Sequence, residues 1–185
     1  MEHIIETFYF LDDGTMPNSE LPVIVYRQVT TADDKTKWFE DTFKANGWTN
    51  NWRDTIYRYD HFHSTTHEVL GIGEGSFTLR IGGRNGISLE VKAGDVLILP
   101  AGTAHSAVSE HVDYTVVGGY PEGREWDLLI GNEDERAQAL ENISQVPLPK
   151  TDPVFGQNGE LPKQWQHQEI GELPDFQKMI GGGGC

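Results

Sequence analysis

The stretch YRYDHFHSTTHEVLG contains three histidines and a glutamate within eight residues, from His61 to Glu68. Side chains two residues apart on a β-strand project from the same face, so His61 and His63 would point together. Glu68 follows the bend at 64–66 and can return a carboxylate oxygen to the same point. Imidazole nitrogen and carboxylate oxygen form the mixed ligand set typical of iron, manganese, nickel or zinc. These three residues are therefore predicted to bind one divalent metal ion.

A second segment, GDVLILPAGTAH, supplies the fourth ligand, His105. An apolar strand and a Pro-Ala-Gly turn precede this histidine, and such a turn aims a side chain into the mouth of a β-barrel. His67 is an alternative ligand, because a tighter bend would let it replace His63 or Glu68. Its other expected role is to hydrogen-bond to a ligand and hold that ligand's orientation.

Three more residues are candidates for contact with a substrate. Tyr57 and Tyr59 share the face of His61 by strand parity, so each is a tentative catalytic residue that would orient a substrate or give it a proton. The alternative for both is packing with a satisfied hydroxyl. Arg80 alternates with apolar neighbours and points the opposite way, where it would bind a substrate carboxylate or face solvent.

The segment that must position these residues reads as strands over about 56–118. Apolar and polar residues alternate in it, and Gly-rich turns, including an Asn-Gly dipeptide in IGGRNGI and the AGD turn at 93–95, separate the runs. Many short strands without interleaved helices indicate an antiparallel barrel. We predict an all-β fold with its barrel core at about 56–120.

Two helices flank the predicted barrel. The first is expected at about 32–46, with Thr31 as its cap and a glycine at its end. The second is expected at about 133–145, with Asn132 as its cap and a proline blocking its continuation. Both show the start and stop signals that make a helix prediction dependable.

The remaining segments are assigned by composition. Pro, Gly, Gln and Asp dominate after Val146, which predicts an extended arm over 147–180 lying on the barrel, and 181–185 form a flexible tail. One domain over 1–180 is expected from the length. The segment IIETFYF near the start can serve as an edge strand that pairs two copies, so a homodimer is predicted.

The first histidine segment resembles the first motif of the cupin superfamily. That motif asks for a glycine, five residues, His-x-His, three or four residues, Glu, six residues and a glycine. His61, His63, Glu68 and Gly75 fit it, and Thr55 replaces the first glycine.

The second segment resembles the second cupin motif in the same way. Gly94, Pro100, Gly102 and His105 fit it, and Ser109 replaces the final asparagine. The stretch HFHSTTHEVLG further resembles a small, poorly characterised subfamily of microbial single-domain cupins, which brings no known reaction.

The resemblance implies a jelly-roll barrel, or double-stranded β-helix, in which His61, His63, Glu68 and His105 are similar to the family's metal ligands. It also implies a choice of functions. A dioxygenase-like metal enzyme acting on a small polar organic molecule is the first expectation. A sugar or keto-acid isomerase or lyase is the second, and a small-molecule-binding or sensory module without turnover is the third.

Charge and composition argue against nucleic-acid-binding, membrane-spanning and exported proteins. The chain carries 29 acidic and 14 basic residues, for a net charge of −15, which repels nucleic acid and anionic lipid. We see no apolar run near the roughly 20 residues of a membrane span and no export signal. The one cysteine, Cys185, cannot form an intramolecular disulfide, which suits a reducing cytoplasm. We expect a small-molecule substrate, no nucleic acid and no membrane.

Overall fold

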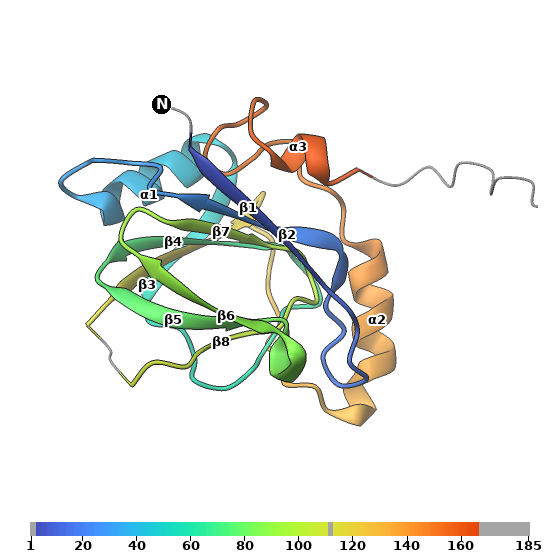
Figure 1. Ribbon diagram of the computed structural model, residues 1–185. Coiled ribbons are helices and arrows are strands. Elements are labelled where there is room, and N and C mark those ends of the chain that lie inside the picture. Colours follow the sequence, from blue (N-terminus) through green and yellow to red (C-terminus); the bar gives the residue numbers. More distant parts are fainter. Residues whose placement is uncertain (1–2, 111–112, 167–185) are drawn as a thin grey trace, which may run out of the picture.

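The computed structural model describes residues 3–110 and 113–166, and its strands form two antiparallel sheets (Figure 1). The six-stranded sheet has the order β1 (Ile4–Phe10), β2 (Ser19–Arg27), β7 (Val96–Leu99), β4 (Glu68–Glu74), β9 (Thr115–Pro121) and β3 (Trp48–Asp54). The three-stranded sheet has the order β6 (Ile87–Lys92), β5 (Ser76–Ile81) and β8 (His105–Ala107). The predicted all-β antiparallel fold is confirmed.

The space between the two sheets holds the main hydrophobic core. Strand alternation decides which side chains enter it, so in β4 Leu70 and Ile72 point inward and Val69 points outward. The inward side chains of both sheets form one buried cluster, which includes Val23, Val25, Leu79, Ile81, Leu97, Leu99, Ala107 and Val116. This double layer is the jelly-roll architecture expected from the cupin resemblance.

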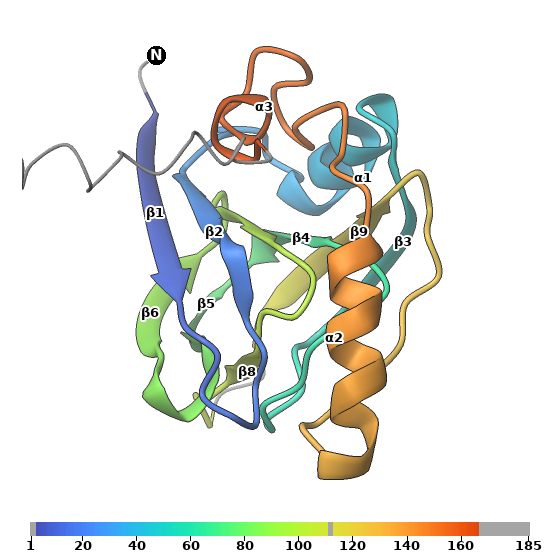
Figure 2. The same cartoon turned by 90° about the vertical axis from the view of Figure 1, so that its right-hand side faces the viewer.

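The outer face of the six-stranded sheet is covered by α1 (Lys35–Ala45) and by the arm that follows residue 146. Phe39 and Phe43 of α1 pack with Val69 and Val117 of the sheet, and Trp165 joins the same cluster just after the short helix α3 (Leu161–Gln164). In Figure 2, α1 and α3 lie at the same end of the molecule. The six-stranded sheet is therefore buried on both of its faces along β4 and β9, the strands next to the histidines.

A second helix, α2 (Arg136–Gln145), runs along the side of the barrel in Figure 2. A 3₁₀ turn, Glu133–Glu135, precedes it. Its buried Ala139 packs against Met16, Phe62 and Ala104. The helix thus supports the segment that contains the first histidines.

The arm is held to the sheet by buried hydrogen bonds as far as the structure describes it. The Asp152 carboxylate, which is fully buried, accepts from Tyr26 Oη at 2.6 Å and from the backbone amides of Val154 and Phe155. Trp165 Nε1 donates to the Pro22 carbonyl at 2.9 Å. The rest of the predicted arm and the tail at 181–185, with Cys185, lie outside the described residues.

The start of the first helix differs from the prediction. The N-cap of α1 is Asp34, whose carboxylate accepts from the Lys37 amide at 2.9 Å, and Thr31 lies outside the helix. Asn132 occupies the predicted N-cap position of the second helical segment, which opens with a 3₁₀ turn. Its side chain makes no capping bond and donates to the Glu135 carboxylate. In the first helix several polar residues compete for the cap, and local propensity does not rank them.

The barrel begins earlier in the chain than the predicted core at 56–120. Strands β1, β2 and β3 precede residue 56 and supply three of the six strands of the larger sheet. Both predicted turns are confirmed: Gly83–Asn85 forms a 3₁₀ turn in the hairpin of β5 and β6, and Gly94, at φ 101°, turns the chain between β6 and β7, which lie in different sheets.

Within the described ranges, every helix is too short or too polar to cross a bilayer.

Candidate metal centre

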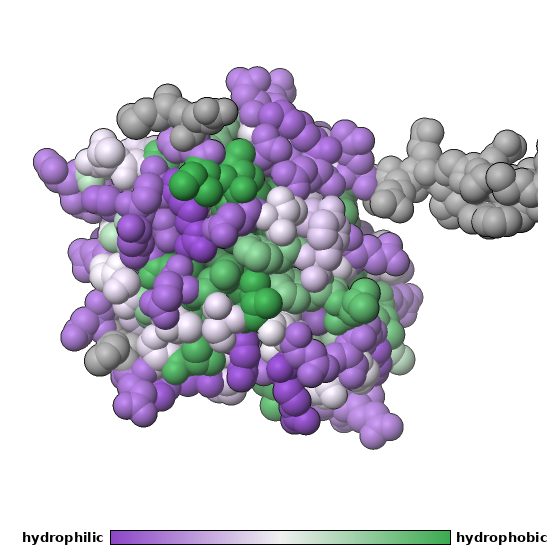
Figure 3. All heavy atoms as spheres, viewed as in Figure 1, coloured by the Kyte–Doolittle hydropathy of each residue, from purple (hydrophilic) through white to green (hydrophobic). Residues whose placement is uncertain are grey.

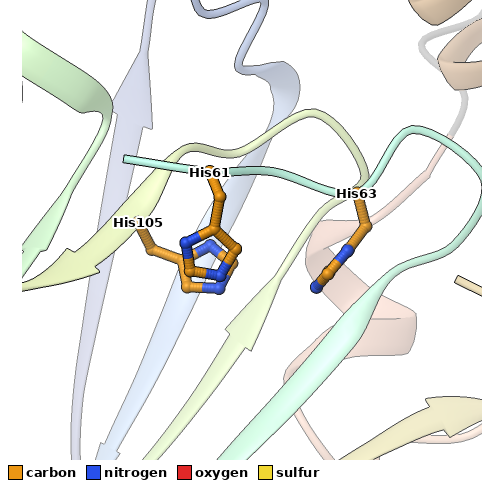
Figure 4. Close-up of side chains that lie close together, drawn as sticks. All are labelled: His61, His63 and His105. Carbon is orange, nitrogen blue, oxygen red and sulfur yellow. The ribbon is translucent and has the colours of Figure 1, made fainter. Parts of the chain in front are cut away.

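His61, His63 and His105 each offer one ring nitrogen that lies within 4.8 Å of those of the other two, and all three residues are buried. Figure 4 shows the rings of His61 and His105 beside each other, with His63 directed toward them. His61 and His105 come together because their backbones exchange two hydrogen bonds, at 3.2 and 2.9 Å. These contacts are isolated bridges, so the expected long strand through His61 and His63 is not present.

Each of these three imidazoles uses Nδ1 to bind a backbone carbonyl. His61 donates to Tyr59 and His105 donates to Thr103, both at 3.1 Å, and His63 donates to Asp127. A carbonyl only accepts, so Nδ1 must carry the proton in all three rings. Each ring, in its neutral form, therefore presents an Nε2 lone pair to the space that the three rings share.

Glu68 joins this space from the first position of β4. It shares strand parity with Leu70 and Ile72, so its side chain enters the barrel interior. Glu68 Oε2 lies 3.3 Å from Nε2 of both His63 and His105, yet it receives no hydrogen bond from the described residues. The other oxygen, Oε1, accepts from Tyr120 Oη at 3.1 Å.

The electrostatics of the group favour an ionised Glu68 carboxylate and a neutral His61 ring. Burial alone would raise the pKa of Glu68, but His63 and His105 outweigh it and hold that pKa below its usual range. Burial, with His105 beside it, lowers the pKa of His61 to about 3. Burial opposes protonation of His63 too, but Glu68 raises the pKa of that ring.

These residues fit a metal ion by their donor chemistry. Three Nε2 lone pairs and one unpartnered carboxylate oxygen converge on a buried point, and converging acceptors repel unless a cation lies between them. Buried charge without a partner is costly, and a divalent ion would satisfy all four groups at once. The structure thus brings together all four predicted ligands.

The four side chains form one end of a cavity of about 420 Å³. Residues 50–57 of β3 and the segment after it line one side, and Tyr120 and Trp126 line another. This size suits a small organic molecule. A bound ion would therefore lie within reach of a ligand that entered from solvent.

Tyr57 and Tyr59, the tentative catalytic residues, lie beside His61, and Tyr59 is not among the residues that line the cavity. Their rings stack at 5.1 Å and both are about half exposed. Tyr57 also lines the cavity, with its ring 5.1 Å from that of His61 in an edge contact. Trp126 makes the corresponding edge contact with His63 at 5.4 Å. A catalytic role for either tyrosine stays a prediction.

An aromatic pair that the sequence analysis did not single out supports Glu68. Trp52 Nε1 donates to Tyr120 Oη at 2.9 Å, and Tyr120 Oη in turn donates a hydrogen bond to Glu68 Oε1. Burial and the nearby Glu68 raise the pKa of Tyr120, so it stays a neutral donor. Trp52 lies against Gly118, where a Cβ would come within 2.0 Å of the indole ring.

His67 lies on the opposite face of β4 from Glu68. Its Nδ1 accepts from the Ala101 amide at 2.9 Å, and its ring lies 4.7 Å from the Trp165 ring in the outer layer. Burial lowers the pKa of His67 to about 3. The alternative in which His67 replaces a ligand therefore does not match the structure.

Arg80 is also separate from the cavity. Its guanidinium binds both oxygens of Asp60, at 3.1 and 2.9 Å, and it does not line the cavity around the histidines. The same carboxylate accepts from Ser106 Oγ at 2.6 Å. Arg80 thus ties β5 to the segment before His61, and the structure gives no support to the predicted binding of a substrate carboxylate.

Several residues of the site carry no signal in the sequence. Tyr120 lies in the strand TVVGGYP and Trp126 in the irregular segment EGREWDLL, neither of which matches a motif. Tyr120 shares the inward parity of Val116, so strand alternation alone could have placed it in the barrel. Nothing comparable indicates Trp126, Asp127 or the Trp52 contact.

Comparison with known proteins gives one family and one curated relative. The sequence profile described as "AraC-like ligand binding domain" matches residues 50–170. An uncharacterised protein, YjlB, of Bacillus subtilis strain 168 is 36% identical over 166 residues, which cover 89% of this chain and 99% of that protein. The match to YjlB therefore runs through nearly the whole of both sequences.

Solved structures with a similar arrangement include two bacterial proteins. Acireductone dioxygenase from Bacillus anthracis, with a cadmium ion in its active centre, is 16% identical, with a TM-score of 0.38 over 69% of this chain and 82% of that one. A conserved double-stranded β-helix protein from Klebsiella pneumoniae is 16% identical, with a TM-score of 0.36 over 71% and 86%. Likeness of this degree carries no information about the chemistry of the site.

Proposed function

This chain belongs to the family of AraC-like ligand-binding domains, which are of cupin type, and from that premise we propose that it is a metal-dependent enzyme acting on a small polar organic molecule. Oxidation by dioxygen is the reaction class we place first. An isomerase or lyase reaction is the alternative within the same site.

One observation carries the proposal. Three buried Nε2 lone pairs and the unpartnered Glu68 Oε2 converge at the end of a cavity of about 420 Å³. Four protein ligands leave one or two positions free on a five- or six-coordinate ion, and free positions are where substrate or dioxygen would bind. A purely structural ion would have no need of a cavity.

The metal determines which chemistry is available. Iron, when bound, would supply dioxygen activation, whereas zinc, manganese or nickel would polarise a carbonyl for isomerisation or cleavage. His61, His63, His105 and Glu68 are the residues that would hold it. The donor set alone selects none of these ions, so the identity of the metal is left to experiment.

The other residues of the cavity would bind the substrate and orient it and Glu68. Tyr57 and Trp126 present aromatic surface beside two of the histidines, which would hold a flat or apolar part of the substrate and exclude water. Tyr120 Oη donates a hydrogen bond to Glu68 Oε1, so Oε2 stays free to face the ion. These residues set geometry and hydration around the reacting molecule.

Metal content is the first measurement. Protein purified without a metal-affinity step is subjected to elemental analysis beside a His61→Ala/His105→Ala double variant. Iron-loaded protein is then assayed in an oxygen electrode against a panel of enols, diols and keto acids. The double variant reports whether any metal found is held at this site.

Each outcome directs the next step. About one equivalent of iron or manganese, lost in the variant, would support the site and the oxidative reaction. Zinc or nickel lost in the variant would support the site and move the search to isomerase and lyase assays. No metal in wild-type protein, even after reconstitution, would contradict the four-ligand assignment.

The family match favours a second candidate function. Its description names ligand binding and no reaction, so the same cavity would serve a sensory module that retains a small molecule without turnover. Binding of a molecule that is recovered unchanged from metal-loaded protein would favour this function.

A cytoplasmic location is also proposed, because the chain has one cysteine and so suits a reducing environment.

A further inference from the structure

His63 differs from the other two histidines in how it is oriented. His61 and His105 donate to carbonyls two residues earlier in their own segments, Tyr59 and Thr103. His63 donates to the carbonyl of Asp127, which is 64 residues away in the sequence. The orientation of His63 therefore depends on how a distant segment is held against it.

The Asp127 side chain holds the two segments together. Its Oδ1 accepts from the Ser64 amide at 2.6 Å and from the Thr65 amide at 3.3 Å, and its Oδ2 accepts from Ser64 Oγ. One carboxylate thus binds the bend directly after His63 while its own backbone carbonyl binds His63. The two interactions reinforce each other, because both fix Asp127 relative to residues 63–65.

Neighbouring contacts add to this attachment without replacing it. Arg124 Nε donates to the Thr65 carbonyl at 3.2 Å, and Thr65 Oγ1 donates to the Glu125 carbonyl at 3.0 Å. From α2, Asn142 Nδ2 donates to Ser64 Oγ at 3.0 Å. Of these residues, Asp127 is the one whose carbonyl accepts the hydrogen bond from His63 Nδ1.

We propose that Asp127 is a positioning residue of the metal centre: its carboxylate fixes the 63–65 bend so that its carbonyl keeps His63 protonated on Nδ1 with Nε2 facing the ion. The same attachment holds Trp126 beside His63 at the cavity wall. The metal-affinity part of this inference rests on the proposed function, whereas the tautomer of His63 is a property of the protein without metal.

The tautomer is the first readout. Nitrogen NMR of ¹⁵N-histidine-labelled, metal-free protein is recorded well above the ordinary histidine pKa of about 6.5, with the His63 signal assigned from its loss in His63→Gln. Wild-type protein should show Nδ1–H for His63. In Asp127→Ala, His63 should become a mixture of tautomers, while His61 and His105 stay as Nδ1–H.

Metal affinity is the second readout. Competition titration with Co²⁺ should show a loss of about 10- to 100-fold in Asp127→Ala, together with a changed visible spectrum of the bound ion. Asp127→Asn should lose less, because its amide oxygen can still accept from the Ser64 and Thr65 amides. It also serves as the test variant if Asp127→Ala does not fold.

Asp152→Asn is the matched control. Asp152 also uses a carboxylate to accept from successive backbone amides of a bend, but it contacts Tyr26 and the arm and none of the metal ligands. It should lower thermal stability and leave both the His63 tautomer and the Co²⁺ affinity unchanged. Its behaviour separates loss of fold from loss of positioning.

The outcomes distinguish the two proposals. Unchanged Nδ1–H on His63 in Asp127→Ala, with Co²⁺ affinity within twofold of wild type, would overturn the positioning role while leaving the proposed function standing. Absence of Co²⁺ binding in wild-type protein would overturn the proposed function, and the tautomer comparison would still decide the role of Asp127.

Discussion

The two carboxylate oxygens of Glu68 make different contacts. Oε1 accepts from Tyr120, which is in turn bound by Trp52, and Oε2 faces two imidazole nitrogens. A carboxylate held at one oxygen cannot rotate freely, so the position of the other oxygen is fixed before any ion arrives. Such preorganisation lowers the entropy cost of binding.

Removal of the Tyr120 hydroxyl should therefore weaken metal binding. In Tyr120→Phe, Glu68 loses the donor that orients it and the Trp52 N–H is left without its acceptor. We expect a loss of about tenfold in metal affinity and about 1–3 kcal/mol in the free energy of unfolding. Competition titration measures the first and chemical denaturation the second.

Tyr114→Phe is the control for that substitution. Its hydroxyl accepts from the Ile56 amide at 3.3 Å, and its ring stacks on Phe77 in the core away from the ligands. The control should lose stability and keep full metal affinity. Equal metal affinities for the two phenylalanine variants would rule out the orienting role of Tyr120.

His67 makes stability depend on pH. Its pKa is lowered to about 3 by burial, against about 6.5 in an unfolded chain. The unfolded state thus binds the proton more readily, so the contribution of His67 to the stability of metal-free protein is full above pH 6.5 and falls as the pH drops toward 3. Each such histidine contributes a slope of up to about 1.4 kcal/mol per pH unit, and His61 adds to it in the same direction.

Denaturation of metal-free protein at a series of pH values tests this dependence. His67→Gln should flatten the fall between pH 6.5 and 3, because glutamine does not titrate and its amide oxygen can accept from the Ala101 amide. An unchanged slope in the variant would show that His67 does not contribute in this way.

At the scale of elements, the pairing of β3 with β9 positions the Trp52–Tyr120 contact. Trp52 is the partner of Gly118 in the ladder, and its indole covers that glycine. A side chain at 118 would push the indole away from Tyr120. The glycine is therefore required by a close approach between strands and not by a turn.

Gly118→Ala should destabilise the protein by about 1–3 kcal/mol through overpacking and should also lower metal affinity. Gly119→Ala is the comparison in the same strand, because its Cβ would meet mainly the terminal amide of Asn51, which can move. Thermal melts of both variants measure the loss of stability, and metal titration measures the loss of metal affinity. A larger effect at 119 than at 118 would contradict the role given to the Trp52 contact.

At the scale of elements, part of the fold and of the candidate site could be predicted from the sequence. Spacing within two short segments was sufficient to place His61, His63, Glu68 and His105 together, because motif spacing reflects local chain geometry. Strands β5 and β6 were also readable, since their apolar residues alternate and their turns carry glycine. These features depend on neighbours in the sequence.

What the sequence could not supply depends on distant neighbours. Trp52 and Asp127 reach the site through strand pairing and one irregular segment, neither of which leaves a periodic pattern. The side of β4 that His67 occupies was undecided because the bend at 64–66 interrupts strand parity. Counting back from the core residues Leu70 and Ile72 resolves it once the strand is known to begin at Glu68.

For the whole molecule, β1 is the feature that bears on assembly. It is an end strand of the six-stranded sheet, and Ile4, Tyr9 and Leu11 in and beside it are more than two-thirds exposed. In Figure 3, hydrophobic residues gather over the area that β1 crosses. An exposed apolar end strand favours pairing with a second copy.

A homodimer paired through β1 is therefore expected at micromolar concentration. Light scattering of wild-type protein should give twice the chain mass of 20.7 kDa, and an Ile4→Lys/Tyr9→Lys variant should give the monomer. Leu140→Lys, an exposed apolar residue on α2, is the control and should remain dimeric. Wild-type protein of monomer mass would exclude this assembly.

The proton positions at the metal centre are set by carbonyls that every amino acid possesses. Tyr59 and Thr103 orient His61 and His105 through the backbone alone, so this contribution survives any substitution that keeps the path of the chain. Evolution can therefore vary both residues without disturbing the imidazoles, and an alignment of homologues would not mark either position as part of the centre. Insertions or deletions near them are the changes that selection should remove.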